Sequence, residues 1–370
     1  MAVRKIDPSD RGELKRFVAL DRDLHGEHPM YWAEPLADVR KRLSGRSAFS
    51  DELELALFLG DEDGRPQARA VAAISRRWQR DQGDDPRGGI GWLTAAPGAD
   101  RAMRQVLDAA EEWLAQRDIP AVLAPFNGNA MLGFGLLTDG FDKSPMFPLL
   151  WNPPHLEAML DAAGYSRRYP MWSYWVDFTS ERYRRARDAA ALAAPGCTIR
   201  ALDKKRWKEE LEVLRVVFNE GMRGEWEMQQ FSPGEFTELF GPIKPVYDPR
   251  MMLFAEVDGE PAGIVFGFGD LTPLLRSFRG RGGPIQILQF LRRAKHFDRT
   301  GLLAIAVLDR FRGRGIGRAL AARFFANVED MGSPGSFYYP VNDHNAASRG
   351  LAESFGGEGR NDYHVFEKAL

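Results

Sequence analysis

The chain repeats one order of predicted elements in its two halves, and this repeat constrains the fold more than any other feature. In each half a strand and a helical region precede an antiparallel hairpin. A strand, a long helix, a strand, a helix and a last strand then follow. The two hairpins are predicted over residues 53–74 and 251–270. An internal repeat of a whole α+β domain explains this order most economically.

The length of the chain agrees with two domains. Its 370 residues exceed the usual size of one domain, which is about 100 to 200 residues. A stretch that is first charged, then alanine-rich, and that ends in Pro-Gly separates the halves. We therefore predict a first domain over residues 1–180, a linker over 181–196 and a second domain over 197–370.

The composition excludes several classes of protein. The 50 Lys and Arg residues nearly balance the 52 Asp and Glu residues, so we expect no nucleic-acid partner and only a local anion site. The single cysteine, Cys197, excludes an internal disulfide and a thiolate cluster, and we expect no metal. The N-terminus lacks the apolar stretch of a secretory signal, and no apolar run is long enough to cross a bilayer. We therefore expect a cytoplasmic protein without a transmembrane segment.

The pentapeptide FRGRG occurs twice, and only the second copy has the surroundings of a phosphate site. This copy, residues 311–315, lies between an apolar strand predicted over 302–307 and a helix predicted over 316–328. A helix N-terminus presents unpaired backbone N–H groups and a partial positive charge, and glycines let a phosphate approach the backbone closely. The first copy, residues 278–282, follows no strand and is predicted to be a loop.

The second copy predicts a cradle for a diphosphate. The Lys-Ser/Thr pair of a P-loop is missing, and so is the GxGxxG fingerprint of a Rossmann fold, so neither ATP hydrolysis nor dinucleotide binding is favoured. The glycines and cations of the predicted cradle are Arg312, Gly313, Arg314, Gly315, Gly317 and Arg318.

Two consecutive motifs of the second half resemble the GNAT (GCN5-related N-acetyltransferase) superfamily. The first is Arg312-x-x-Gly315-x-Gly317, and the second is NDHNAASRGLAESFGG before the last strand. The resemblance implies an α+β fold of two tandem GNAT-like domains, each with a mixed, mostly antiparallel sheet flanked by helices. It also implies acetyl-CoA or a longer acyl-CoA as co-substrate. The first half keeps only Gly98 at the equivalent loop, so we interpret it as a degenerate copy without a CoA signature.

The resemblance implies which residues bind coenzyme A. Backbone N–H groups from Arg312 to Gly317 would bind the pyrophosphate. The strand that ends at Val307 would splay from its neighbour, and the pantetheine arm would pair with it there. Asn345 matches an asparagine that contacts this arm in many members, whereas Ala352 replaces their thiolate-protonating tyrosine. The implied CoA-binding residues are Ala306, Val307, Leu308, Arg312, Gly313, Arg314, Gly315, Ile316, Gly317, Arg318 and Asn345.

The implied reaction is direct attack of a primary amine on the thioester, which needs a base and a polarised carbonyl. A strand advances about 3.3 Å per residue, so the thioester falls several residues before Val307, near the end of the preceding antiparallel strand. Asp270 follows that strand and is the first candidate for a base or amine-binding carboxylate; capping of a loop is its alternative role. Glu256, in the partner strand, is the second candidate. Further candidates are Asp309 and His344 for the base and Tyr338, Tyr339 and Tyr363 for the proton donor, although each tyrosine also fits a core position.

Three interpretations of the function stay open. The leading one is an acyl-CoA-dependent N-acyltransferase that acts on a hydrophobic or lipid-like amine. Most of the chain resembles a bacterial branch of tandem GNAT-like proteins and is similar to bacterial enzymes that N-acylate sphingoid bases to make ceramides. A helix near residues 287–296 is apolar on one side and basic on the other, and it either covers a core or makes peripheral contact with lipid. The alternatives are an acetyl-CoA-dependent N-acetyltransferase of a small polar amine and a non-catalytic acyl-CoA-binding sensor.

Overall fold

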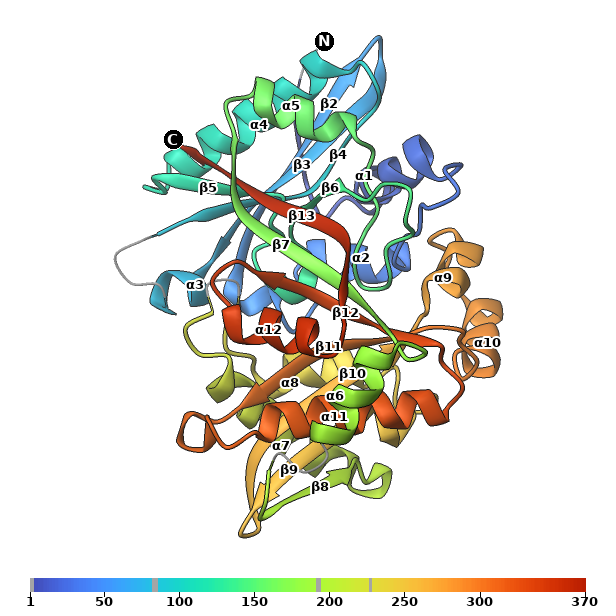
Figure 1. Cartoon of the computed structure of the whole chain (residues 1–370). Coiled ribbons are helices and arrows are strands. Elements are labelled where there is room, and N and C mark those ends of the chain that lie inside the picture. Colours follow the sequence, from blue (N-terminus) through green and yellow to red (C-terminus); the bar gives the residue numbers. More distant parts are fainter. Residues whose placement is uncertain (1–2, 82–85, 191–193, 226–227) are drawn as a thin grey trace. The chain divides into compact units, whose positions relative to one another are not determined.

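The chain folds into two compact units that interleave along the sequence. The computed structural model describes residues 3–81, 86–190, 194–225 and 228–370, and Figure 1 shows its helices and strands. Unit 1 contains Met1–Pro170, Leu275–Gln286 and Asp362–Leu370, whereas unit 2 contains Met171–Leu274 and Ile287–Asn361. The predicted α+β class is confirmed, because each unit has a mostly antiparallel sheet flanked by helices.

Unit 1 is built on a sheet with the strand order β1-β2-β3-β4-β5-β13, and β6 pairs with β13 beside this path. Neighbouring strands pair antiparallel, except β4 and β5, which pair parallel. Its strands are β1 (Val3–Ile6), β2 (Leu53–Glu62), β3 (Arg65–Ser75), β4 (Gly88–Ala95), β5 (Ala121–Ala124), β6 (Leu136–Asp139) and β13 (Glu358–Ala369) from Asp362 onward. Its helices are α1 (Arg11–His25), α2 (Leu36–Leu43), α3 (Arg76–Asp81), α4 (Asp100–Ala115) and α5 (His155–Ala162), with short 3-10 turns η1 (Ser50–Glu52) and η2 (Ala130–Leu132).

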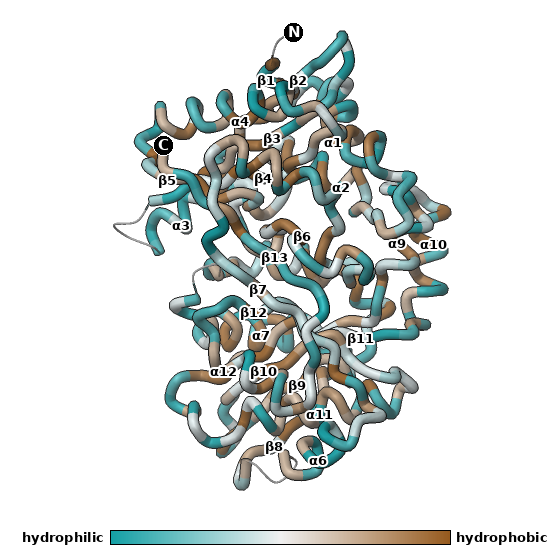
Figure 2. The backbone as a smooth tube through the Cα atoms, turned by 45° about the horizontal axis from the view of Figure 1, so that its top comes forward, coloured by the Kyte–Doolittle hydropathy of each residue, from teal (hydrophilic) through white to brown (hydrophobic). Residues whose placement is uncertain are grey.

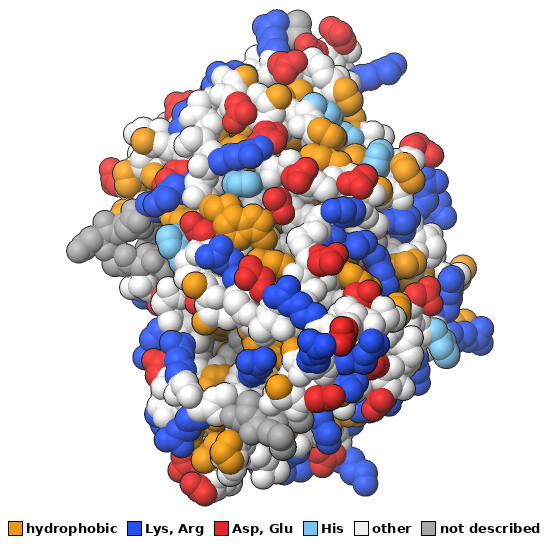
Figure 3. All heavy atoms as spheres, in the orientation of Figure 1, with side chains coloured by type: hydrophobic (Ala, Val, Ile, Leu, Met, Phe, Trp, Pro, Cys, Tyr) orange, Lys and Arg blue, Asp and Glu red, His pale blue; other side chains and the backbone are white. Residues whose placement is uncertain are grey.

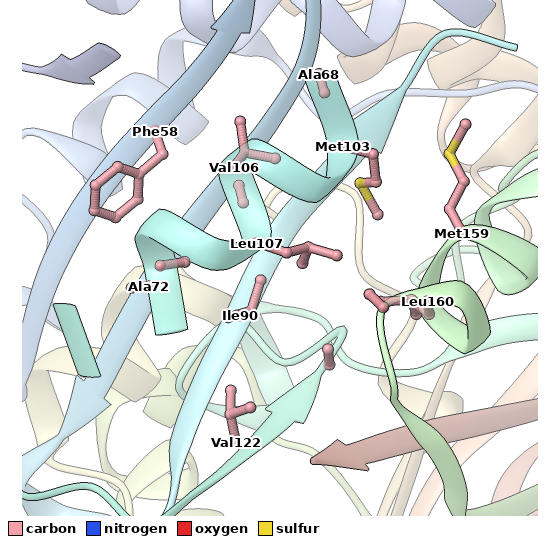
Figure 4. Packing of buried hydrophobic residues seen from close by; sticks show 14 of the residues in the cluster. Phe58, Ala68, Ala72, Ile90, Met103, Val106, Leu107, Val122, Met159 and Leu160 are labelled. Atoms are coloured by element: carbon pink, nitrogen blue, oxygen red, sulfur yellow. The ribbon is translucent and has the colours of Figure 1, made fainter. Parts of the chain in front are cut away.

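Helix α4 forms the centre of the core of unit 1. Its apolar face packs on small side chains of β2 and β3. Small residues are needed because helix and strand lie close together: a Cβ on Gly60 would lie 2.8 Å from the carbonyl oxygen of Ala102. Figure 4 shows buried side chains of this core, including Phe58, Ala68, Ala72, Ile90, Met103, Val106, Leu107, Val122, Met159 and Leu160.

Unit 2 repeats the same plan with the strand order β7-β12-β11-β10-β9-β8. Only β11 and β12 pair parallel in this sheet. Its strands are β7 (Ser166–Asp177) from Met171 onward, β8 (Cys197–Ala201), β9 (Met252–Val257), β10 (Glu260–Gly269), β11 (Thr300–Val307) and β12 (Gly335–Asn342). Its helices are α6 (Glu181–Ala190), α7 (Trp207–Gly221), α8 (Pro233–Phe240), α11 (Ile316–Asp330) and α12 (Ala346–Ser354), with 3-10 turns η3 (Lys204–Arg206), η4 (Pro249–Met251) and η5 (Asp309–Phe311).

The boundary between units 1 and 2 falls inside each of two helices. These are α9 (Thr272–Phe278) and α10 (Pro284–Arg293), which occupy the connection between β10 and β11. The helix α10 was predicted, but α9 was not. The first FRGRG begins at the last residue of α9, and its remaining four residues form a loop, as predicted, with Arg279 and Gly280 at φ of 50° and 71°. Figure 2 shows hydrophobic stretches along the inner strands and hydrophilic stretches in outer helices and turns.

The predicted linker over residues 181–196 contains a packed helix. Helix α6 buries Tyr183, Ala186 and Ala190, which lie on one face of an otherwise charged segment. The Tyr183 hydroxyl donates to Glu329 of α11 at 2.8 Å, and the Tyr183 ring contacts Phe325. Three apolar positions among arginines are a weak helical signal, which is why the sequence favoured a linker. Residues 191–193 lie outside the described part of the chain.

Each unit completes its sheet with the last strand of the other repeat. Strand β7 ends the first repeat, but its residues from Met171 onward pair antiparallel with β12 in unit 2. Strand β13 ends the second repeat, but its residues from Phe366 to Ala369 pair antiparallel with β5 in unit 1. The predicted domains 1–180 and 197–370 follow the sequence repeat, whereas the compact units follow spatial contacts.

Candidate functional site

The parallel strands β11 and β12 separate after a short stretch of pairing. They pair only from Thr300 with Ser336 to Leu302 with Tyr338. Strand β11 nevertheless continues along β10 on its other side, up to Val307 opposite Gly263. In the described part of unit 2, the β12-facing edge of β11 beyond Leu302 therefore has no strand partner. The structure shows the splay that the family resemblance implied.

A β-bulge marks the point where the strands separate. Ala304 pairs with Phe266 and Leu302 pairs with Gly267, so Leu303 has no partner on β10. A bulge bends its strand and redirects the neighbouring backbone groups. The residues Leu303, Ala304 and Ile305 are half-buried, whereas Thr300, Gly301 and Leu302 before them are buried. The splay thus opens onto a partly accessible strip of β11.

The second FRGRG lies at the wide end of this splay. Gly313 and Gly315 have φ of 78° and 76°, a region that residues with a Cβ adopt at a cost. Helix α11 begins directly afterwards, and its first backbone bond to the loop runs from the Ala319 N–H to the Gly315 carbonyl oxygen. Among the described residues, no acceptor bonds the backbone N–H groups of residues 313–318. These groups form the kind of concave donor array that binds phosphate at a helix N-terminus.

The arginines of this loop are arranged in two ways. The Arg312 guanidinium is tethered, because it bonds the Asp309 carboxylate and the Gly221 carbonyl oxygen, each at 3.0 Å. Arg314 and Arg318 are exposed and, within the described chain, form no ion pair. The loop therefore combines free backbone donors with two uncompensated positive charges.

Helix α7 ends against the strip of β11 that the splay exposes. A Cβ on Gly221 would lie 2.9 Å from the Cβ of Ala306 and 3.4 Å from the backbone nitrogen of Val307. Only a glycine permits this close approach without displacing β11. The residues that follow α7 consequently begin beside two of the residues predicted to contact the pantetheine arm.

Glu225, shortly after α7, contacts the other border of the splay. Its carboxylate accepts bonds from the side-chain amides of Asn342 and Asn345, at 3.2 and 3.1 Å. Asn342 ends β12, and Asn345 is the N-cap of α12, where its Oδ1 accepts from the Ser348 N–H at 2.9 Å. Sequence reasoning missed Glu225, because it lies in a loop without periodicity or motif.

Tyr338 lies where the splay begins, and it contacts α12. Its side chain is buried, and its hydroxyl is 2.8 Å from the Ser348 hydroxyl. Burial raises the pKa of Tyr338 to about 12, so the phenol is protonated at neutral pH. Ser348 lies one helical turn before the fully buried Ala352, the position of the missing family tyrosine. Tyr339 is also buried on β12, and Tyr363 lies in unit 1.

The two carboxylates predicted as bases have structural contacts instead. Asp270 has a side chain only 3% exposed; its Oδ1 accepts from the Thr272 N–H at 2.9 Å and its Oδ2 from the Arg299 Nε at 3.0 Å. Both oxygens are engaged, as in the alternative capping role. Glu256 accepts from the Arg200 Nε at 2.7 Å and lies on β9, which β10 separates from β11 and the splay. The geometry therefore argues against both predictions.

The equivalent splay in unit 1 is filled by the chain itself. Strands β4 and β5 pair only at Gly88–Val122 and Gly89–Leu123. The Trp92 N–H, at a residue with φ of 43°, donates to the Asn127 Oδ1 at 2.7 Å. A Cβ on Gly91 would lie only 2.1 Å from that oxygen. The segment after β5 thus occupies the space that stays open in unit 2, which agrees with a degenerate copy.

The site lies in a segment of the chain that matches a known protein family. Residues 218–356, which contain the splay, the glycine loop and α12, match the model of the acetyltransferase (GNAT) family. Members of this family are N-acyltransferases that use acetyl-CoA or acyl-CoA as co-substrate. Residues 218–356 of this chain thus match one GNAT domain, and the whole chain is similar in fold to a tandem GNAT protein.

The whole chain is similar to several known proteins. It is 29% identical over 368 residues to a bacterial ceramide synthase from Caulobacter vibrioides, covering 97% of this chain and 95% of the relative. It is 23% identical to Protein YghO from Escherichia coli, covering 98% and 94%. The structure of a tandem GNAT protein from the clavulanic acid biosynthesis pathway matches with a TM-score of 0.56 and 15% identity, covering 99% of this chain and 98% of that one. A GCN5-related N-acetyltransferase from Sphaerobacter thermophilus matches with a TM-score of 0.51 and 15% identity, covering 100% and 95%.

Among the described residues, no group of three or more His, Cys, Asp or Glu side chains is placed to hold a metal ion. Within the same residues, no helix is both long and apolar enough to cross a membrane.

Proposed function

We propose that this chain is an acyl-CoA-dependent N-acyltransferase that transfers the acyl group of a CoA thioester to the primary amine of a hydrophobic, lipid-like acceptor. One observation carries the proposal: the splay between β11 and β12 leads to a glycine loop whose backbone N–H groups have no acceptor among the described residues. An extended thioester arm fits the first feature and a pyrophosphate fits the second.

Coenzyme A would bind with its charged end at the loop and its arm along β11. The N–H groups of residues 313–318 hold the pyrophosphate, and Arg314 and Arg318 add charge beside it. Ala306, Val307 and Leu308 pair with the pantetheine arm, and Asn345 bonds it from the opposite border. The backbone of β11 within the splay donates to the thioester carbonyl oxygen and so polarises it.

We assign the role of the base to Glu225 in place of Asp270 and Glu256, and the role of the proton donor to Tyr338, one of the predicted candidates. The acceptor nitrogen attacks the thioester carbon, a C–N bond forms, and the C–S bond breaks. Glu225 binds the ammonium form of the acceptor and takes its first proton, and after the C–N bond forms the nitrogen loses a second proton to solvent. Tyr338 gives its hydroxyl proton to the departing sulfur, and Ser348 orients that hydroxyl. Solvent then returns a proton to Tyr338 and removes one from Glu225.

A lipid-like acceptor is favoured over a small polar amine by the similarity of the whole chain to the Caulobacter protein named bacterial ceramide synthase. That similarity covers both units, so it includes the residues around the splay and the α9–α10 connection. The acyl length is part of the same proposal: a ceramide contains a long acyl chain, so a long-chain acyl-CoA is the expected donor.

The test is a two-by-two activity assay on the purified chain. Acetyl-CoA or palmitoyl-CoA, below its micellar concentration, is offered with a sphingoid base or with a small polar amine. Release of free CoA thiol is followed, and the product is identified by mass spectrometry. The proposal predicts amide formation only with the sphingoid base, and faster with palmitoyl-CoA. Turnover restricted to acetyl-CoA and the polar amine contradicts the proposed acceptor, and binding without any turnover supports a sensor.

A further inference from the structure

Helix α10 presents an apolar surface to solvent. None of its residues is buried. The described chain has seven exposed large hydrophobic residues, and four of them lie on this helix: Ile285 (68% exposed), Ile287 (60%), Leu288 (48%) and Leu291 (40%). The sequence left open whether α10 covers a core or contacts lipid, and this exposure excludes the first alternative for its apolar face.

The exposed apolar residues are not those that attach the helix to the protein. At about 100° per residue, Ile287, Leu288 and Leu291 lie on one face. Phe290 is half-buried and points in another direction, and Ala294, just after the helix, is buried. The helix is therefore held by its Phe290 side, and its apolar face is left for another contact. We call Ile285, Ile287, Leu288 and Leu291 the α10 apolar face.

Positive charge surrounds the α10 apolar face. The segment from residue 276 to 299 contains seven Lys and Arg residues but a single acidic residue, Asp298, in a chain whose net charge is −2. Two of the seven are ion-paired: Arg279 with Glu27 and Arg299 with Asp270. Four others are exposed and form no ion pair with described residues, namely Arg281, Arg292, Arg293 and Lys295. Figure 3 shows Lys and Arg side chains gathered with hydrophobic ones at the edge where α10 lies in Figure 1.

We infer that α10 docks the protein on an anionic lipid bilayer. The helix would lie in the plane of the interface, with the α10 apolar face among the upper acyl chains and the four free cations against lipid phosphates. A basic rim favours this occupant over a second copy of the chain, because two copies meeting through α10 would bring like charges together. A helix of ten residues is about 15 Å long and cannot span a bilayer, so the contact is peripheral.

This inference goes beyond the proposed reaction and does not depend on it. A membrane contact would hold the enzyme where a lipid-like amine is dissolved, but vesicle binding can be measured whatever the acceptor is. Failure of vesicle binding and failure of the acyl-transfer assay are therefore separate results.

The experiment is co-sedimentation of the full chain with vesicles of phosphatidylcholine alone or with a third of phosphatidylglycerol, at low and high salt. The wild type should bind the anionic vesicles and lose binding at high salt. The charge variant R292Q/R293Q should bind about 25-fold more weakly, because each cation near an anionic surface contributes roughly fivefold. The apolar variant I287N/L291N should lose about tenfold or more.

Matched controls exclude general effects of charge or exposed surface. Lys15 and Arg16 are adjacent exposed cations on α1, and Val216 is an exposed apolar residue on α7. The variants K15Q/R16Q and V216N should bind vesicles like the wild type, and circular dichroism should show all variants equally folded. Absence of wild-type binding, or equal loss in the controls, overturns the inference. It is also overturned if light scattering shows a dimer that I287N/L291N abolishes, because a second copy would then cover α10.

Discussion

Replacing Tyr338 by phenylalanine separates a catalytic role of this hydroxyl from a structural one. The substitution removes one oxygen and one hydrogen bond, the 2.8 Å contact with Ser348, and leaves the ring in its buried site. A neutral hydrogen bond of this kind contributes about 0.5–1.5 kcal/mol to stability. Proton donation to a leaving group contributes about 10²- to 10⁴-fold to the rate. We therefore expect a fall in kcat of at least about 100-fold with a loss of only about 1 kcal/mol in unfolding free energy.

The matched control is Tyr247→Phe, elsewhere in unit 2. The Tyr247 hydroxyl is buried and donates to two carbonyl oxygens, of Met251 and Gly267, at 2.9 and 2.8 Å. Its removal should cost more stability than removal of the Tyr338 hydroxyl but leave kcat nearly unchanged. Thiol release is followed under saturating substrates, and unfolding is followed in urea. A Tyr338→Phe protein that keeps kcat within about threefold, far less than general acids contribute, would refute the assignment.

The pH dependence of stability and of kcat tests Tyr338 in a second way. Burial raises the pKa of Tyr338 to about 12, above the ordinary value of about 10 for tyrosine. The folded protein therefore holds this proton at pH values where an unfolded chain loses it, so this contribution to stability is present below pH 10 and lost as the pH rises toward 12. Between pH 7 and about 10, kcat of the wild type should show no decline from ionisation of Tyr338.

Two other variants test the carboxylates. Glu225→Gln keeps an acceptor for only one of the amides of Asn342 and Asn345, which bond different oxygens, and it cannot take a proton. We expect kcat/KM to fall about 10²- to 10⁴-fold, with a loss of only about 1 kcal/mol in unfolding free energy. The same change at the partly exposed Glu220 should leave kcat/KM unchanged, and equal activity of both variants would exclude Glu225 as the base. Asp270→Asn leaves the Arg299 guanidinium without its charged partner and should lower the unfolding free energy by about 1–3 kcal/mol, less than for a fully buried pair because Arg299 is 25% exposed. Its kcat at a temperature where it stays folded should equal the wild-type value, and a 100-fold loss there would restore Asp270 as the base.

Much of the fold could be predicted, because both repeats have strong local signals. The turn of the second hairpin at Asp258 and Gly259 has φ of 51° and 80°, as its sequence requires. Long amphipathic helices such as α4 and α11 follow their apolar stripes. The exchange of the last strands could not be predicted, since the sequence of a strand does not identify the strand with which it pairs. Tertiary contacts decide which strands pair, and the pattern of hydrophobic residues along the sequence does not contain these contacts.

One part of the candidate site could be predicted from the sequence and another part could not. The glycine loop was identified because its spacing and its place between strand and helix are local properties. The contacts of the predicted carboxylates could not be foreseen, because distance along a strand does not show whether an oxygen is free or bound to an arginine. Asp270 lies near the predicted end of the strand, but its Oδ2 accepts a hydrogen bond from Arg299, which is 29 residues away in the sequence. Glu225 becomes a candidate only through its contacts with Asn342 and Asn345, which lie more than a hundred residues further along the chain.

The most direct test of the account is calorimetric titration of the chain with acetyl-CoA and palmitoyl-CoA, beside the variant G315A/G317A. Gly315 has φ of 76°, where a Cβ costs about 1–2 kcal/mol, and alanines there should turn the N–H groups away from the pyrophosphate. We expect the wild type to bind both ligands, palmitoyl-CoA more tightly, and the folded variant to bind neither. If the wild type binds neither ligand, or the variant binds as well as the wild type, the second FRGRG is not a coenzyme A cradle and the central claim is wrong.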